Sequence, residues 1–112
     1  MALNMGIWNS FKIKLLQHGY TFDEHETLVG NGIQIDKIYN SQGELIEGDF
    51  ILSDYSYGSQ HGMLEAGFGF GISQHTYDDV LGYLTDDEAL DLVMGTYWEK
   101  QGIAPVEEDE EE

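Results

Sequence analysis

Near the start of the chain, apolar residues recur at helical spacing between residues 8 and 18. Asn9 or Ser10 suits the N-cap, because the side-chain oxygen of either residue can accept a hydrogen bond from a free backbone N–H. Gly19 follows as a stop signal. The pattern therefore predicts a short N-terminal helix over residues 8–18. Its apolar stripe consists of Phe11, Leu15 and Leu16.

From residue 20 the pattern changes to extended segments separated by turn residues. Ile33 and Ile35 alternate on one face, but Ile38 is out of step with them, which predicts a bulge near Asp36 and Lys37. Glycine and asparagine mark the turns between the segments. The pattern predicts an antiparallel meander of three strands, within residues 20–29, 32–40 and 44–57.

Residues 63–72 are apolar at every second position and rich in glycine at the positions between. This alternation favours a fourth strand with a glycine face on which another segment can pack closely. A short helix over residues 62–67, followed by a glycine-rich loop, is the alternative. The repeated glycines do not match a phosphate-binding loop, because the lysine of that motif is missing.

The C-terminal third has the signals of helices. Thr76 to Asp79 resembles a capping box with Asp in place of Glu, and Thr85 to Glu88 matches the capping-box pattern directly. The second box precedes an apolar stripe that predicts a helix over residues 86–101. That stripe consists of Leu90, Val93, Met94 and Tyr97.

Together these elements predict one α+β domain over residues 1–104. It comprises a short N-terminal helix, an antiparallel sheet of three or four strands and two C-terminal helices. Residues 105–112 form an acidic tail that we expect to be disordered, because a run of like charges without apolar residues cannot pack. Neither a signal peptide nor a membrane-spanning segment is expected, which favours a cytoplasmic location.

Charge changes this picture more than any motif does. The chain has 112 residues, with 22 acids, 4 lysines and a formal net charge of −18. Residues 78–112 hold 13 acids and 1 lysine, so two thirds of the net charge lies in the last third of the chain. Such a field attracts basic partners and repels nucleic acid and anionic membranes.

The acids of this last third are the first candidate binding site. Carboxylates in the first turn of a helix also stabilise its positive end by about 0.3–1 kcal/mol each, so part of the cluster has a structural explanation. Capping does not explain Glu99 or the acidic tail. The candidates before the tail are Asp78, Asp79, Asp86, Asp87, Glu88, Asp91 and Glu99.

In size, charge and layout the chain resembles small acidic inhibitors encoded by phages and mobile elements, which block CRISPR, restriction or repair enzymes by mimicking nucleic acid. Residues 80–93 also resemble the ends of small phage-encoded proteins. The resemblance implies an array of carboxylates that occupies a basic groove, since duplex DNA carries one charge per roughly 1.7 Å of axis. Tyr55 and Tyr57, expected on one strand face beside Asp54, are the candidate aromatic anchors of the same contact.

Other chemistries have weaker support in the sequence. His18, His25, His61 and His75 are scattered without metal-ligand spacing, and cysteine is absent, so no metal site or cofactor is expected. Acidic pairs that could act in hydrolysis are numerous enough here to arise by chance. We therefore expect a non-enzymatic protein that binds the basic groove of a nuclease or other nucleic-acid enzyme. The alternative is a phage accessory or assembly module whose acidity serves solubility.

Overall fold

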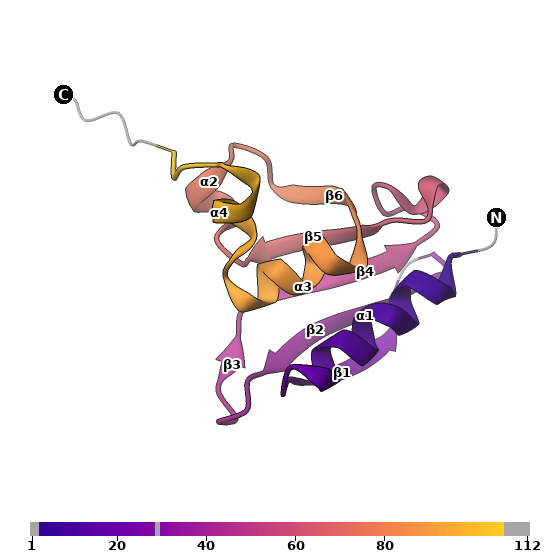
Figure 1. Ribbon diagram of the computed structural model, residues 1–112. Coiled ribbons are helices and arrows are strands. Elements are labelled where there is room, and N and C mark those ends of the chain that lie inside the picture. The colour runs from indigo at the N-terminus through magenta and orange to yellow at the C-terminus, as the bar shows by residue number, and fades with distance from the viewer. Residues whose placement is uncertain (1–2, 29, 107–112) are drawn as a thin grey trace.

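The computed structural model describes residues 3–28 and 30–106, and its fold is α+β, as the sequence predicts (Figure 1). Within these residues, a six-stranded antiparallel sheet is combined with four helices and one short 3-10 helix. The strands are β1 (Thr21–Glu26), β2 (Gly32–Tyr39), β3 (Leu45–Ile46), β4 (Gly48–Ser53), β5 (Leu64–Gly69) and β6 (Val80–Leu84). The helices are α1 (Met5–Gln17), η1 (Ser59–His61), α2 (Ile72–His75), α3 (Asp86–Met94) and α4 (Tyr97–Gln101).

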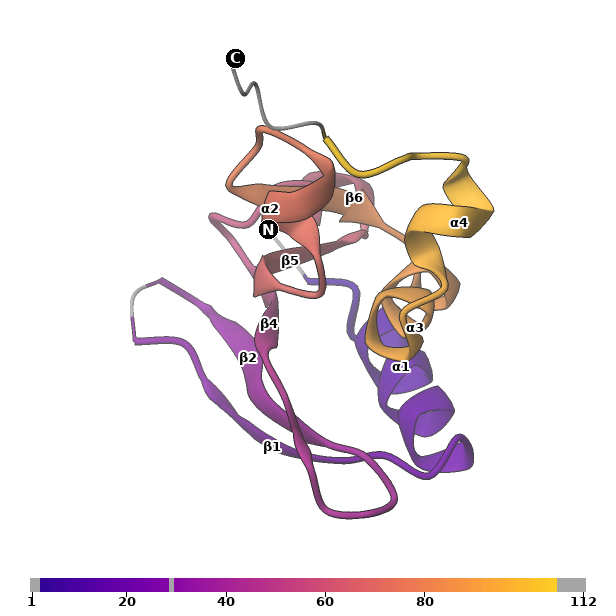
Figure 2. The same ribbon diagram turned by 90° about the vertical axis from the view of Figure 1, so that its left-hand side faces the viewer.

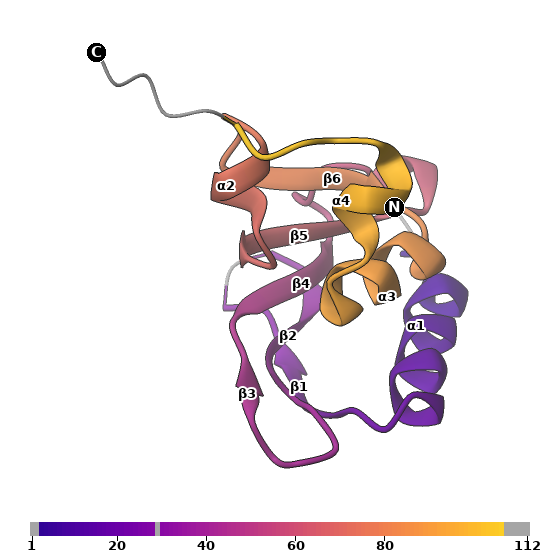
Figure 3. The same cartoon turned by 60° about the vertical axis from the view of Figure 1, so that its left-hand side comes forward.

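The sheet is a meander with the strand order β1-β2-β4-β5-β6, and β3 pairs with β2 beside this path. β1 and β6 therefore form opposite edges, at the bottom and the top of the sheet in Figure 3. Helices α1 and α3 pack side by side against one face (Figure 2). The core lies between these two layers, where the rings of Phe11 and Phe50 meet at 4.6 Å.

Helix α1 begins earlier than the sequence pattern predicts. Its N-cap is Asn4, whose side chain accepts a hydrogen bond from the backbone of Ile7, so the prediction of a cap at residue 9 or 10 is wrong. Trp8, Phe11 and Leu15 are buried, whereas Leu16 is exposed. The core-facing stripe of α1 thus starts one turn before the predicted one.

The bulge predicted in the second strand is present. In the pairing of β1 with β2, Asp23 faces Lys37 and Glu24 faces Ile35, which leaves Asp36 as the extra residue. Because of this extra residue, the side chains of Ile35 and Ile38 point to the same face of the sheet, and both are completely buried.

The segment at residues 63–72 forms a strand, not a helix, but it does not alternate throughout. Leu64 and Ala66 are buried, whereas Phe68 is exposed because the pairing with β4 slips at Gly48 and Asp49. The following turn places Gly69, Phe70 and Gly71 in succession at positive φ. Close packing and turning together explain the glycines, since a Cβ at Gly67 would lie 2.7 Å from Asp49 Oδ1.

The C-terminal third differs from the predicted pair of helices in two places. Thr76 does not cap a helix; the segment after it leads into strand β6 (residues 80–84), which pairs with β5. The helix predicted over residues 86–101 is divided at Gly95, which ends α3 in the left-handed conformation before α4 begins. Leu90, Val93 and Tyr97 are buried as the stripe predicts.

The first two residues of the predicted tail, 105 and 106, are described, and the Val106 N–H donates to the Gln74 carbonyl at 2.8 Å. Residues 107–112 lie outside the described part of the chain, so their predicted disorder stays a prediction. Within residues 3–28 and 30–106, the helices are too short and too polar to cross a membrane.

Candidate functional site

The acids of the C-terminal third do not form one surface. Asp86 and Asp87, at the start of α3, face α1, where Lys14 Nζ lies 3.0 Å from Asp86 Oδ2 and also pairs with Asp87. Asp86 accepts a further hydrogen bond from the hydroxyl of Ser10. Burial alone would raise the pKa of Asp86, but the hydrogen bonds from Ser10 and Lys14 outweigh it and lower that pKa. These two acids fasten α3 to α1.

Glu88 and Asp91 also have structural partners. Glu88 completes the predicted capping box: its side chain accepts from the Thr85 N–H at 2.9 Å, and Thr85 Oγ1 accepts from the Glu88 N–H at 3.1 Å. Asp91 accepts from Lys100 Nζ at 2.9 Å, which links α3 to α4. Four of the seven acids proposed from the sequence therefore serve the fold. Glu99 is exposed on α4.

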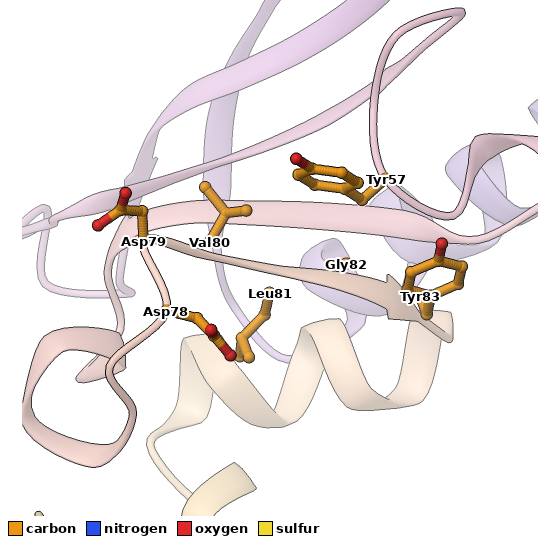
Figure 4. Close-up of a pocket in the computed structure, with 7 residues that line it drawn as sticks. All are labelled: Tyr57, Asp78, Asp79, Val80, Leu81, Gly82 and Tyr83. Carbon is orange, nitrogen blue, oxygen red and sulfur yellow. The ribbon is translucent and has the colours of Figure 1, made fainter.

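Asp78 and Asp79 instead lie exposed immediately before β6, at the mouth of an open groove of about 680 Å³ (Figure 4). A volume of this size falls within the usual range of ligand pockets. The groove brings together residues from two distant parts of the sequence: Tyr57 from the turn after β4, and Asp78, Asp79, Val80, Leu81, Gly82 and Tyr83 from β6 and its approach.

A second hollow of about 310 Å³ adjoins this groove and shares Tyr57 and Tyr83 with it. Tyr55 and His61 also line the second hollow, and the rings of His61 and Tyr83 are 5.8 Å apart. We call the combined region the aromatic–acidic surface. It is defined by Tyr55, Tyr57, His61, Asp78, Asp79 and Tyr83.

Buried serines, not a strand, present the two anchoring tyrosines. The hydroxyl of Ser56 accepts from the Ser53 N–H at 2.9 Å and donates to the Ser53 carbonyl at 3.0 Å, which closes a tight turn directly after β4. Tyr55 and Tyr57 project from this turn and are 76% and 61% exposed. The expectation that they share a strand face is wrong, because β4 ends at Ser53.

Tyr57 is held in place by the neighbouring strands. Its N–H donates to Glu65 Oε1 at 2.7 Å, and its Cβ lies so close to Gly82 that any side chain at residue 82 would clash. Burial raises the pKa of Glu65, and the hydrogen bond from Tyr57 lowers it in part. Tyr57 thus lies on β6 only because residue 82 is glycine.

Tyr83 has a strained backbone with φ of 60°, which is uncommon for a residue with a side chain. Its neighbour across the turn is Gly58, where a Cβ would lie 2.7 Å from the Tyr83 nitrogen. Strain of this kind persists only where surrounding structure enforces it, and it often marks functional surfaces. The tight fit fixes Tyr57 and Tyr83 relative to each other.

Thr76 has a different role from the predicted helix cap. Its hydroxyl accepts from the Asp78 N–H at 3.0 Å, so it forms a local turn that leads the two aspartates into β6. The structure thereby brings together four of the residues proposed from the sequence, namely Tyr55, Tyr57, Asp78 and Asp79. Sequence reasoning missed Tyr83 and His61. Residues 80–84 read Val-Leu-Gly-Tyr-Leu without polar alternation, so no local pattern indicates that Tyr83 is exposed.

Lysines contribute little to neutralising this surface. Lys12 pairs with Glu24 at 3.0 Å, and Lys14 and Lys100 pair with acids of α3. No basic residue other than His61 lines the two hollows within the described residues. The aromatic–acidic surface therefore offers carboxylates and phenol rings to a cation, both by charge and by cation–π contact.

A second polar cluster lies on the sheet. His25 Nε2 is 3.1 Å from Asp36 Oδ2, and Gln34 Nε2 donates to Asp49 Oδ2 at 2.8 Å. Burial raises the pKa of Asp49, although hydrogen bonds from Gln34 and the Gly67 backbone partly offset it. In the described part of the chain, His, Asp and Glu side chains form no group of three or more that could hold a metal ion.

Comparisons of the chain with models of known protein families, with curated proteins and with solved structures find no match.

Proposed function

We propose that this protein is a non-enzymatic acidic binding protein that occupies the basic nucleic-acid-binding groove of a nuclease or another nucleic-acid enzyme and inhibits it. The observation that carries the proposal is the convergence of Asp78 and Asp79 with Tyr57 and Tyr83 on one hollowed surface. These residues combine the two features that a nucleic acid presents to its enzymes, negative charge and flat aromatic faces.

The charge of the whole chain supports the same function. A net charge of −18 steers the protein toward a basic partner over distances longer than any contact. The acids of α3 add to this field even though three of them are paired locally, because only two lysines, Lys14 and Lys100, pair with them among the described residues. We place the binding event in the cytoplasm of a host cell, where such enzymes meet nucleic acid.

A second candidate function is that of a phage accessory or assembly module whose acidity serves solubility. The exposed apolar side chain of Phe68 favours it, since this residue on β5 is 61% exposed. An interface built around Phe68 would be nearly insensitive to salt, whereas an electrostatic one weakens steeply as salt rises.

The test is capture from host lysate with three forms of the chain: wild type, D78N/D79N, and E44Q/E47Q as a control with the same change of charge. Glu44 and Glu47 are exposed near β3, away from the groove lining. We expect wild type and control to capture a basic nucleic-acid enzyme that duplex DNA displaces, and D78N/D79N to retain at least about tenfold less. Equal capture by all three forms would contradict a role for this surface.

A further inference from the structure

The two edges of the sheet have opposite chemistry. Edge strand β1 carries Asp23, Glu24 and Glu26, and its side chains are mostly exposed. Charges on an edge strand discourage pairing with other chains. Edge strand β6 reads Val-Leu-Gly-Tyr-Leu and has no charge within it. One edge of the sheet is therefore protected by carboxylates, whereas the other is interrupted only by a register shift beside Tyr83.

The outer edge of β6 is also open. Among residues 3–28 and 30–106, the backbone of β6 makes hydrogen bonds with no segment besides β5. The groove of about 680 Å³ follows the strand, since Val80 to Tyr83 are consecutive lining residues (Figure 4). An edge of this kind presents unpaired N–H and C=O groups to another strand.

Charge determines which strand fits. Asp78 and Asp79 stand at the entrance of the groove, and Tyr57 lies along one side of it. A second copy of the chain would bring its own aspartates and a further net charge of −18 to the same edge, which electrostatic repulsion opposes. An extended segment with lysine or arginine at the end near the aspartates meets no such repulsion.

We propose that the partner binds by adding an extended, basic segment of its own as a further strand along the outer edge of β6. This inference rests on the proposed function and specifies its contact. The five residues of β6 limit the added segment to roughly five residues, and the register shift beside Tyr83, whose φ is 60°, interrupts the pairing there. Backbone hydrogen bonds supply affinity in this mode, and side chains on alternate positions supply specificity. Basic side chains of the segment pair with Asp78 and Asp79.

The test begins with a library of random decapeptides selected on the immobilised full chain at low salt. The strongest binder is synthesised in three forms, one unmodified and two N-methylated at alternate residues in the two possible registers. Each register removes the donors along one edge of the peptide but keeps the charge and side chains. We expect selection of lysine or arginine with β-branched residues. The unmodified form should bind at least about tenfold more tightly than the register whose methylated amides face β6, and about as tightly as the other register.

Amide hydrogen exchange, followed by NMR, locates the contact. Saturation with the unmodified peptide should slow exchange of outward amides within Val80–Leu84 at least about tenfold and leave those of Thr21–Glu26 unchanged. Equal affinity of the unmodified peptide and both methylated registers, or binding without protection of β6, overturns strand addition. If strand addition is overturned in this way but peptide binding is still lost in D78N/D79N, the proposed function stands without strand addition. Loss of neither peptide binding nor lysate capture in D78N/D79N overturns both.

Discussion

Individual carboxylates in this protein differ in what they do, although they look alike in the sequence. Asp86 is tied to Ser10 and Lys14, and its pKa is lowered by these contacts despite the opposing effect of burial. Asp78 and Asp79 are exposed beside a groove. Replacing Asp86 would therefore change the stability of the fold as well as any affinity for a partner. Replacing Asp78 and Asp79 should change the affinity alone.

Two half-buried carboxylates on the sheet act against folding when they are ionised. Burial raises the pKa values of Asp49 and Glu65 above their usual values of 3.8 and 4.5. A carboxyl whose pKa is raised on folding favours the folded state while protonated, and this contribution is lost as pH rises through the folded-state pKa. Their ionisation therefore lowers stability between about pH 4 and neutrality.

We predict that E65Q increases the free energy of unfolding at pH 7, by up to about 1 kcal/mol after allowance for solvent screening. The replacement keeps an oxygen acceptor for the Tyr57 N–H, whereas Asp49 accepts from both Gln34 and the Gly67 backbone, and one asparagine oxygen could not serve both. The gain should disappear as pH falls below the usual glutamate pKa of 4.5, where the wild-type carboxyl becomes protonated in both states. Urea unfolding at several pH values measures it.

Glu47→Gln serves as the control, because Glu47 is exposed and its replacement makes the same change in net charge. A gain in E47Q as large as in E65Q would show that general repulsion, not burial, causes the effect.

At the scale of elements, two similar sequence signals give different structures. Thr76 and Thr85 each precede an acid three residues later, but only Thr85 caps a helix. Residues 80–84 become a strand because they pair with β5, a contact between distant parts of the chain that no local pattern reports. Long-range pairing thus overrides local preference.

Replacing each threonine tests this difference. We predict that T85A lowers the free energy of unfolding by about 1 kcal/mol, the usual effect of losing an N-cap side chain. T76A removes only a local turn hydrogen bond and should cost less than about 0.5 kcal/mol. Urea unfolding followed by circular dichroism compares the two variants, and equal losses would argue against the assigned roles.

Local patterns were sufficient for the α+β class, for the bulge at Asp36 and for the capping box at Thr85. They were insufficient where a single residue or a distant contact determines where an element ends or whether it is a helix or a strand. Gly95 divides the last predicted helix, and Ser53 and Ser56 end the third predicted strand before the tyrosines.

The candidate site was also only partly predictable from local patterns. Sequence analysis proposed Tyr55, Tyr57, Asp78 and Asp79 as separate candidates, but only the fold brings them together. The sequence pattern also predicted that acids of α3 belong to the binding surface. That prediction is wrong for Asp86, because its partner Lys14 lies 72 residues earlier and no local pattern shows the pairing.

At the scale of the whole molecule, the net charge of −18 and the asymmetry of the sheet edges act together. The charge brings a basic partner near, and it keeps copies of the chain apart. The open edge at β6 and its tyrosines then determine where the partner binds. Salt at physiological concentration limits the reach of this field to roughly 8 Å, so affinity should depend strongly on ionic strength.

The most direct test of this account measures the affinity of the captured enzyme for the chain by calorimetry across a series of salt concentrations. For wild type and E44Q/E47Q, we expect the affinity to fall steeply with salt, because ions are released on binding. For D78N/D79N, we expect weaker binding at low salt and a shallower slope. The same affinity and slope in D78N/D79N as in wild type would contradict binding through the aromatic–acidic surface.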